Sequence, residues 1–186
     1  LLQTTAAIVP TDWSADGQRI VYSTFGAKTG SDLWLVPREG GEPTPFSVTE
    51  AEERNGRLSP DGRWMAYTSS TDTGGGSEIF VKPFPATGIS TRWQVSNGGG
   101  RQPVWHPGGR TLFYVSPDQK IVSSEVDGSG KVFVAGAART FADIRVAIWD
   151  RANQGSAFAI TPAGDRLLVS SATEVTRPIT IVLNWT

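Results

Sequence analysis

Few residues of this 186-residue chain could carry out chemistry on their own. His106 is the only histidine and there is no cysteine, which excludes most transition-metal sites. Because histidine titrates near neutral pH, His106 could act as a general base. A Ser-His-Asp triad would also need a G-x-S-x-G nucleophile elbow, and the sequence contains none. We therefore expect no catalytic residue and no enzyme activity in this chain.

Two glycine-containing stretches resemble ligand loops. The segment GAKTG at 26–30 lacks the complete G-x-x-x-x-G-K-[ST] frame of a phosphate loop. The segment STDTGGGSE at 70–78 places Asp72 and Glu78 around flexible glycines but lacks the spaced carboxylates of a dedicated calcium loop. Residues 184–186, Asn-Trp-Thr, match a glycosylation acceptor only inside a predicted strand. We expect no metal and no cofactor.

The stretch that contains Ser59-Pro60-Asp61-Gly62 occurs four times, which identifies the chain as a repeat protein. Its glycines follow one another at intervals of 45, 47 and 55 residues, and all three tyrosines of the chain share one repeat position. The four copies are SADGQRIVY at 14–22, SPDGRWMAY at 59–67, HPGGRTLFY at 106–114 and TPAGDRLLV at 161–169.

The repeated stretch has the composition of a tight turn. Pro60 fixes φ at the first turn position, and Gly62 supplies a positive φ. The hydroxyl of Ser59 can bond to amides of the same turn, and His106 occupies the position of Ser59 in the third copy. We therefore expect structural turns, and no active site, at Asp16, Gly17, Asp61, Gly62, Gly109 and Gly164.

Between these turns the sequence alternates polar and apolar residues in short runs, which predicts strands. Each repeat contains four such runs, and four-stranded units of this length are typical of β-propeller blades. A blade leaves two apolar faces uncovered, so blades must stack around an axis. We predict an all-β propeller of about four blades' worth of strands.

The repeat phase predicts the blade boundaries. We expect one last strand of a preceding blade at 1–7, three blades at 8–49, 50–96 and 97–142, and an incomplete blade at 143–186. The end strands could pair laterally and close a ring of four. We favour the alternative, a slice of a six- or seven-bladed ring.

Composition excludes several classes of function. A formal net charge of −1, with scattered basic residues, gives no electrostatic footprint for nucleic acid. No apolar run is long enough to cross a membrane as a helix. The absence of cysteine leaves the redox compartment open.

Several stretches carry a family resemblance: DLWLVPREGGEPTPF, RLSPDGRWMAYTSS, EIFVKPFP, WQVSNGGGRQPVWHPGGRTLFYVS and the terminal ITIVLNWT. They resemble the WD40-like propeller repeats of the TolB family, and more closely the propeller tails of bacterial, Acidobacteria-like Ser/Thr protein kinases. The resemblance implies a non-catalytic sensory or scaffolding tail, with any kinase activity in an upstream domain. It also favours an extracytoplasmic location. The alternative is a free-standing periplasmic TolB-like protein.

Geometry predicts which face of the propeller binds a partner. In a meander, the repeated turns share one face, and the longer, varied loops at 24–31, 48–57, 70–77, 96–103 and 142–155 share the other. Binding residues are often carried on loops that a rigid scaffold holds in place. We expect contacts to a protein or small ligand from Arg54, Arg101, Arg145, Trp149, Asp150 and Arg151.

Overall fold

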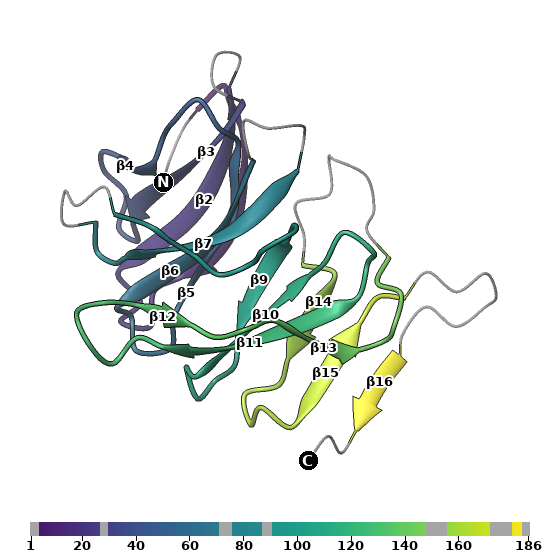
Figure 1. The fold of residues 1–186 in the computed structure, drawn as a ribbon. Helices are drawn as coiled ribbons and strands as arrows, with labels where there is room; N and C mark the ends of the chain where they lie inside the picture. Colours follow the sequence, from purple (N-terminus) through teal and green to yellow (C-terminus); the bar gives the residue numbers. More distant parts are fainter. Residues whose placement is uncertain are drawn as a thin grey trace.

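The computed structural model describes residues 4–26, 30–70, 76–86, 91–147, 156–171 and 180–183, and they form an all-β protein (Figure 1). The strands form four antiparallel sheets that follow one another along the chain. The predicted fold class is confirmed. The first sheet, blade 1, contains β1 (Ala7–Trp13), β2 (Arg19–Gly26), β3 (Gly30–Pro37) and β4 (Thr44–Ser47), paired in that order.

The other three blades repeat the meander of blade 1. Blade 2 contains β5 (Glu53–Leu58), β6 (Trp64–Ser70), β7 (Ser77–Pro83) and β8 (Trp93–Gln94). Blade 3 contains β9 (Arg101–Trp105), β10 (Thr111–Val115), β11 (Ile121–Asp127), β12 (Val134–Ala135) and β13 (Arg139–Ala142), the last two both pairing with β11. Blade 4 contains β14 (Phe158–Ile160), β15 (Arg166–Val169) and β16 (Thr180–Leu183).

The predicted boundaries after residues 49, 96 and 142 fall between these sheets, whereas the one after residue 7 falls inside β1. Ala7 belongs to β1 and pairs with Phe25 of blade 1. Residues 1–3 of the predicted leading strand lie outside the described residues. The connection from blade 3 to blade 4 makes an isolated bridge between Val146 and Ser171. The numerical boundaries themselves stay predictions.

The hydrophobic core lies between the blades. Tyr67 and Phe80 of blade 2 pack on Val21 and Leu33 of blade 1. The opposite face of blade 2 packs on blade 3 through Trp64, Ile79, Leu112 and Tyr114. Phe113 and Val115 of blade 3 pack on Phe158 and Leu167 of blade 4. Alternate residues of one strand thus face the preceding and the following blade, as the two-residue period of a strand requires.

The repeated turns join the first two strands of each blade. In the second turn, Ser59 Oγ donates to Asp61 Oδ1 over 2.5 Å, and the amide of Gly62 donates to the carbonyl of Ser59 over 2.9 Å. Gly62 has φ 68°, a conformation that L side chains rarely adopt. In the third turn, the amide of Gly108 donates to Nδ1 of His106 over 2.9 Å. His106 thus accepts a hydrogen bond within its turn.

Candidate functional site at the central channel

The first strands of the four blades, β1, β5, β9 and β14, line a common cavity of about 260 Å³. Because the first strands of propeller blades surround the central axis, we call this cavity the central channel. Asp12, Arg57, Val104 and Ala159 come from these four strands, one from each, and each stands two residues before the Ser, Thr or His of its turn. These positions are equivalent in the repeat, yet they carry an acid, a base, a β-branched residue and alanine. The scaffold therefore repeats while the chemistry of the wall varies.

Polar contacts between blades fix the charged side chains of this channel. Asp12 Oδ2 of blade 1 accepts a hydrogen bond from the amide of Leu58 in blade 2 over 2.7 Å. Arg57 Nη2 of blade 2 donates to Ser156 Oγ before β14 over 3.1 Å. Trp105 Nε1 of blade 3 donates to the carbonyl of Arg57 over 3.0 Å. The channel therefore holds a carboxylate and a guanidinium beside an indole in defined positions.

Two channel strands contain a left-handed residue that is not glycine. Asn55 in β5 and Gln102 in β9 both have φ 55°, and they occupy the same repeat position, 47 residues apart. The amide of Gln102 donates to Thr68 Oγ1 over 3.1 Å, and its Oε1 accepts from the amide of Ala157 over 3.0 Å. Bulged residues in strained conformations are common beside binding sites. The left-handed conformation of these two residues was not predictable from the sequence, because neither residue is glycine.

The predicted contact residue Arg54 lies at the start of β5 and joins blade 2 to blade 1. Its Nε donates to Ser31 Oγ over 3.0 Å, and its Nη2 pairs with Glu52 Oε2 over 2.6 Å. Its guanidinium lies 5.9 Å from the centroid of the Phe25 ring. Arg101 begins β9 and is half-buried. Both therefore lie at the entry of channel strands.

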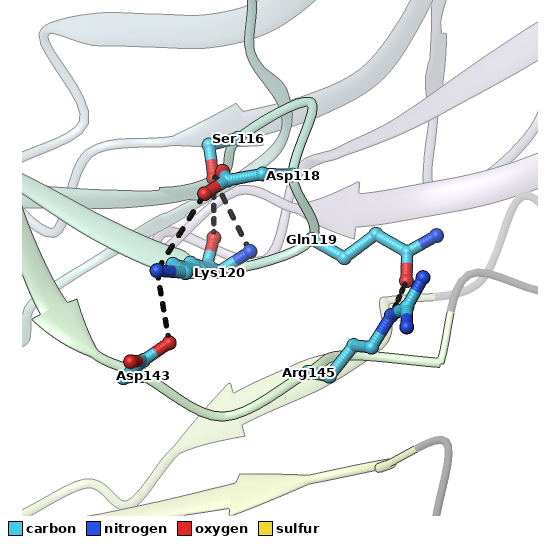
Figure 2. A network of polar contacts seen from close by, with 6 residues as sticks. All are labelled: Ser116, Asp118, Gln119, Lys120, Asp143 and Arg145. Carbon is cyan, nitrogen blue, oxygen red and sulfur yellow. Dashed lines mark hydrogen bonds and ion pairs between the residues drawn. The ribbon is translucent and has the colours of Figure 1, made fainter.

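Arg145 is part of a polar network between a turn and the connection to blade 4 (Figure 2). Its Nε donates to Gln119 Oε1 over 2.9 Å. In the same network Lys120 Nζ pairs with Asp143 Oδ1 over 3.0 Å, and the hydrogen bond to Asp143 raises the pKa of Lys120. These contacts fasten the connection to the β10–β11 turn. Three further predicted contact residues lie outside the described residues: Trp149, Asp150 and Arg151.

A buried polar cluster that was not predicted from the sequence lies between blades 1 and 2. Glu53 is fully buried, and its Oε1 accepts a hydrogen bond from Thr49 Oγ1 over 2.5 Å. Burial raises the pKa of Glu53 and lowers the pKa of Lys82, whose Nζ donates to Ser47 Oγ over 2.9 Å. Burial also raises the pKa of Tyr67 to about 12. Glu53 lies within the charged stretch TEAEERNGR at 49–57, whose composition alone suggests exposure to solvent.

We expect the variant Glu53→Gln to be more thermally stable than the parent at pH 7. The raised pKa means that the folded state favours the protonated carboxyl, so this group lowers stability as pH rises from the unfolded value of about 4.5 through the folded pKa. A neutral amide keeps an acceptor for Thr49 and removes the buried charge. The difference in melting temperature should shrink as pH falls toward 4.5. A variant less stable than the parent at pH 7, with a difference that shrinks as pH falls, would show that attraction to Lys82 outweighs burial.

The described residues contain neither a helix able to cross a membrane nor a group of three or more acidic, histidine or cysteine side chains that could hold a metal ion. Radially stacked four-stranded meanders around a central channel define a β-propeller. No protein-family model matches the chain, and a comparison with curated proteins finds no relative.

Solved propellers resemble the structure over most of its length. TolB from Acinetobacter baumannii matches 97% of this chain with a TM-score of 0.69 and 16% identity. The propeller domain of the trilobed protease from Pyrococcus furiosus matches 98% with a TM-score of 0.57 and 14% identity. The chain spans 41% of the former and 56% of the latter. At such identities the likeness shows the fold alone, which is a β-propeller.

These comparisons correct the prediction that the chain is not an enzyme. The match to an oligogalacturonate lyase covers 89% of this chain and 45% of the lyase, with a TM-score of 0.63 and 14% identity. The match to the periplasmic gluconolactonase of Pseudomonas aeruginosa covers 89% of this chain and 47% of the gluconolactonase, with a TM-score of 0.58 and 16% identity. We had excluded catalysis because the chain has a single histidine and no nucleophile elbow, and because its turn motif repeats. That inference is wrong, because enzymes share this repeated scaffold and one fold can host many functions.

Proposed function

We propose that this chain is a binding module that holds a protein partner at the mouth of its central channel. The observation that carries the proposal is the variation of Asp12, Arg57, Val104 and Ala159 at equivalent positions of a repeated scaffold. Packing alone would be satisfied by similar residues in every blade. Fixed charges beside Trp105 suit recognition, since aromatic and arginine side chains are enriched at interface hot spots.

The mouth on the side of the long loops is the favoured contact surface. Arg54 and Arg101 lie at the start of β5 and β9, on this side of the propeller, whereas the cavity reaches Pro60 of a repeated turn at the other end of β5. The cavity of about 260 Å³ is at the small end for a drug-sized ligand. An extended segment or a single side chain of a partner protein fits this size better than a large cofactor.

In its larger context, we propose that the module is the sensory or interaction part of a bacterial protein such as a Ser/Thr kinase. Support comes from the resemblance of DLWLVPREGGEPTPF and ITIVLNWT to the propeller tails of such kinases. A free-standing periplasmic propeller is the alternative. The coding sequence upstream of Leu1 distinguishes them: a kinase domain followed by a spanning helix supports the first, and a signal peptide alone supports the second.

Photo-crosslinking tests the proposed contact surface. A photoreactive amino acid replaces Ala159 in the channel of the full-length protein, and Val134, which is 57% exposed on the outer strand β12, serves as the control position. After irradiation of cells, we expect a discrete protein adduct from position 159 and none from position 134. The yield of the adduct from position 159 should fall in the variant Arg57→Gln. Adducts from position 134 alone, or from neither position, would contradict the proposal.

A further inference from the structure

A second and larger cavity, of about 410 Å³, lies on the face of blade 3 that is turned toward blade 4. Phe113, which packs on blade 4, forms part of its wall together with Phe141; the two rings stand edge to face, with centroids 5.0 Å apart. Thr111, Ser123, Glu125 and Arg139 supply polar atoms. The cavity is separate from the central channel and shares none of its lining residues.

The preceding blade shows how this space is filled when it is part of the core. In blade 2, Trp64 pairs with Pro83, and Val81 pairs with both Ala66 and Trp93. In blade 3 the same pairing positions join Thr111 to Glu125, and Ser123 to both Phe113 and Arg139. The repeat therefore replaces Trp64, Val81, Pro83 and Trp93 by Thr111, Ser123, Glu125 and Arg139.

These replacements change the character of the space. Trp64 and Trp93 stack edge to face at 5.4 Å and help to fill the interface of blades 2 and 3. Their counterparts in blade 3 are Thr111, a small hydroxyl residue, and Arg139, which is exposed, and the space between them and the rest of the blade stays open as the cavity. Four apolar or aromatic positions have become polar together.

The outer strand of blade 3 is interrupted at the cavity. β12 pairs with β11 at Val126 and Asp127, and β13 pairs with it at residues 121–123. Between them, the amide of Gly136 donates to the carbonyl of Glu125 over 2.8 Å, and Ser124 Oγ donates to the carbonyl of Gly136 over 2.7 Å. The interruption presents Gly136 and Ala137 as part of the cavity lining, and the amide and the carbonyl of Gly136 are already bonded.

Opposite charges flank the cavity without neutralising one another. Within the described part of the chain, neither Arg139 nor Glu125 forms an ion pair. His106 accepts the amide of Gly108 at Nδ1, so Nε2 of the neutral ring is a hydrogen-bond donor. One cationic and one anionic side chain, in the same lining as two hydroxyls and two phenyl rings, are complementary to a ligand that carries both charges and an apolar group.

From this geometry we propose that the cavity is a binding site for a small zwitterion, an α-amino acid with an apolar side chain. Arg139 would bind the carboxylate, Glu125 the ammonium group, and Phe113 with Phe141 the side chain. The site is independent of the proposed protein contact at the channel.

Titration calorimetry of the whole chain with leucine and phenylalanine tests the site. Matched probes are the corresponding amino-acid amide, which lacks the carboxylate, the N-acetyl derivative, which lacks the ammonium group, and glucose as a neutral polyhydroxy compound. We expect one amino acid to bind and both blocked derivatives to bind about tenfold or more weakly, since charge-assisted hydrogen bonds are the strong ones. Binding of glucose but not of the amino acids would overturn the zwitterion assignment.

The variant Thr111→Trp tests the location, because it places in blade 3 the residue that blade 2 carries at Trp64. We expect it to fold and to lose amino-acid binding. Arg139→Gln should weaken binding of the amino acid and of its N-acetyl derivative but leave binding of the amide unchanged. Glu125→Gln should weaken binding of the amino acid and of the amide but leave binding of the N-acetyl derivative unchanged. If Thr111→Trp fails to fold, these two exposed-residue variants decide. Absence of amino-acid binding to the parent protein at millimolar concentration, or binding unaltered in both charge variants, would overturn the proposal.

Discussion

Replacing Trp64 by alanine is expected to lower the free energy of unfolding by about 3–5 kcal/mol, the cost typical of truncating a large aromatic core side chain. Trp64 is 4% exposed, and its ring lies 5.4 Å from that of Trp93 and 5.2 Å from that of Phe133. Its Nε1 donates to the carbonyl of Gly128 over 3.0 Å. The variant therefore loses contacts on both sides of the interface between blades 2 and 3. Urea denaturation monitored by circular dichroism measures the loss.

Two control variants separate the contributions of Trp64. Trp13→Ala removes the same side chain from a site where it is 51% exposed, and we expect a loss of about 1 kcal/mol or less. Trp64→Phe retains most of the packing and removes the hydrogen bond to Gly128, which contributes about 1 kcal/mol. Equal losses for Trp13→Ala and Trp64→Ala would contradict the placement of Trp64 at the centre of this interface.

The repeated sequence predicted the fold because each local signal agrees with the others. The tyrosines show why: Tyr67 and Tyr114 are both nearly inaccessible and lie between blades, as their shared repeat position indicates. A side chain at a fixed place in every blade must meet the neighbouring blade in the same way. Period, turn residues and aromatic phase therefore point to one architecture.

The sites were less predictable because they depend on differences between repeats. Arg145 was expected to contact a partner, which stays a prediction; the structure shows that it also donates to Gln119 within the chain. The exposed charge pattern of a sequence does not show which arginine already has an acceptor. Glu53 stood in a charged segment, and only strand pairing with Ser69 reveals that it is inside. The repeat shows that Thr111 stands where blade 2 has Trp64. Only the pairing of the neighbouring strands shows that this replacement lies at a cavity.

Gly164→Ala is expected to lower the free energy of unfolding by about 2–3 kcal/mol, from two separable causes. Gly164 has φ +75°, where an L side chain costs roughly 1–2 kcal/mol. A Cβ at this position would also lie 2.5 Å from Nε2 of His106 in blade 3, so the imidazole must move. Moving it breaks the hydrogen bond from the Gly108 amide to Nδ1, which contributes about 1 kcal/mol.

Gly62→Ala isolates the first cause, because Gly62 has φ +68° and no heavy atom within 4 Å of its added Cβ. We expect this control to lose only the backbone contribution. In the double variant His106→Ser/Gly164→Ala the imidazole is gone, so Gly164→Ala should cost about as much as Gly62→Ala when measured against His106→Ser. That coupling would establish His106 as a contact between blades 3 and 4. Equal losses for Gly164→Ala with and without His106 would instead assign the entire effect to the backbone.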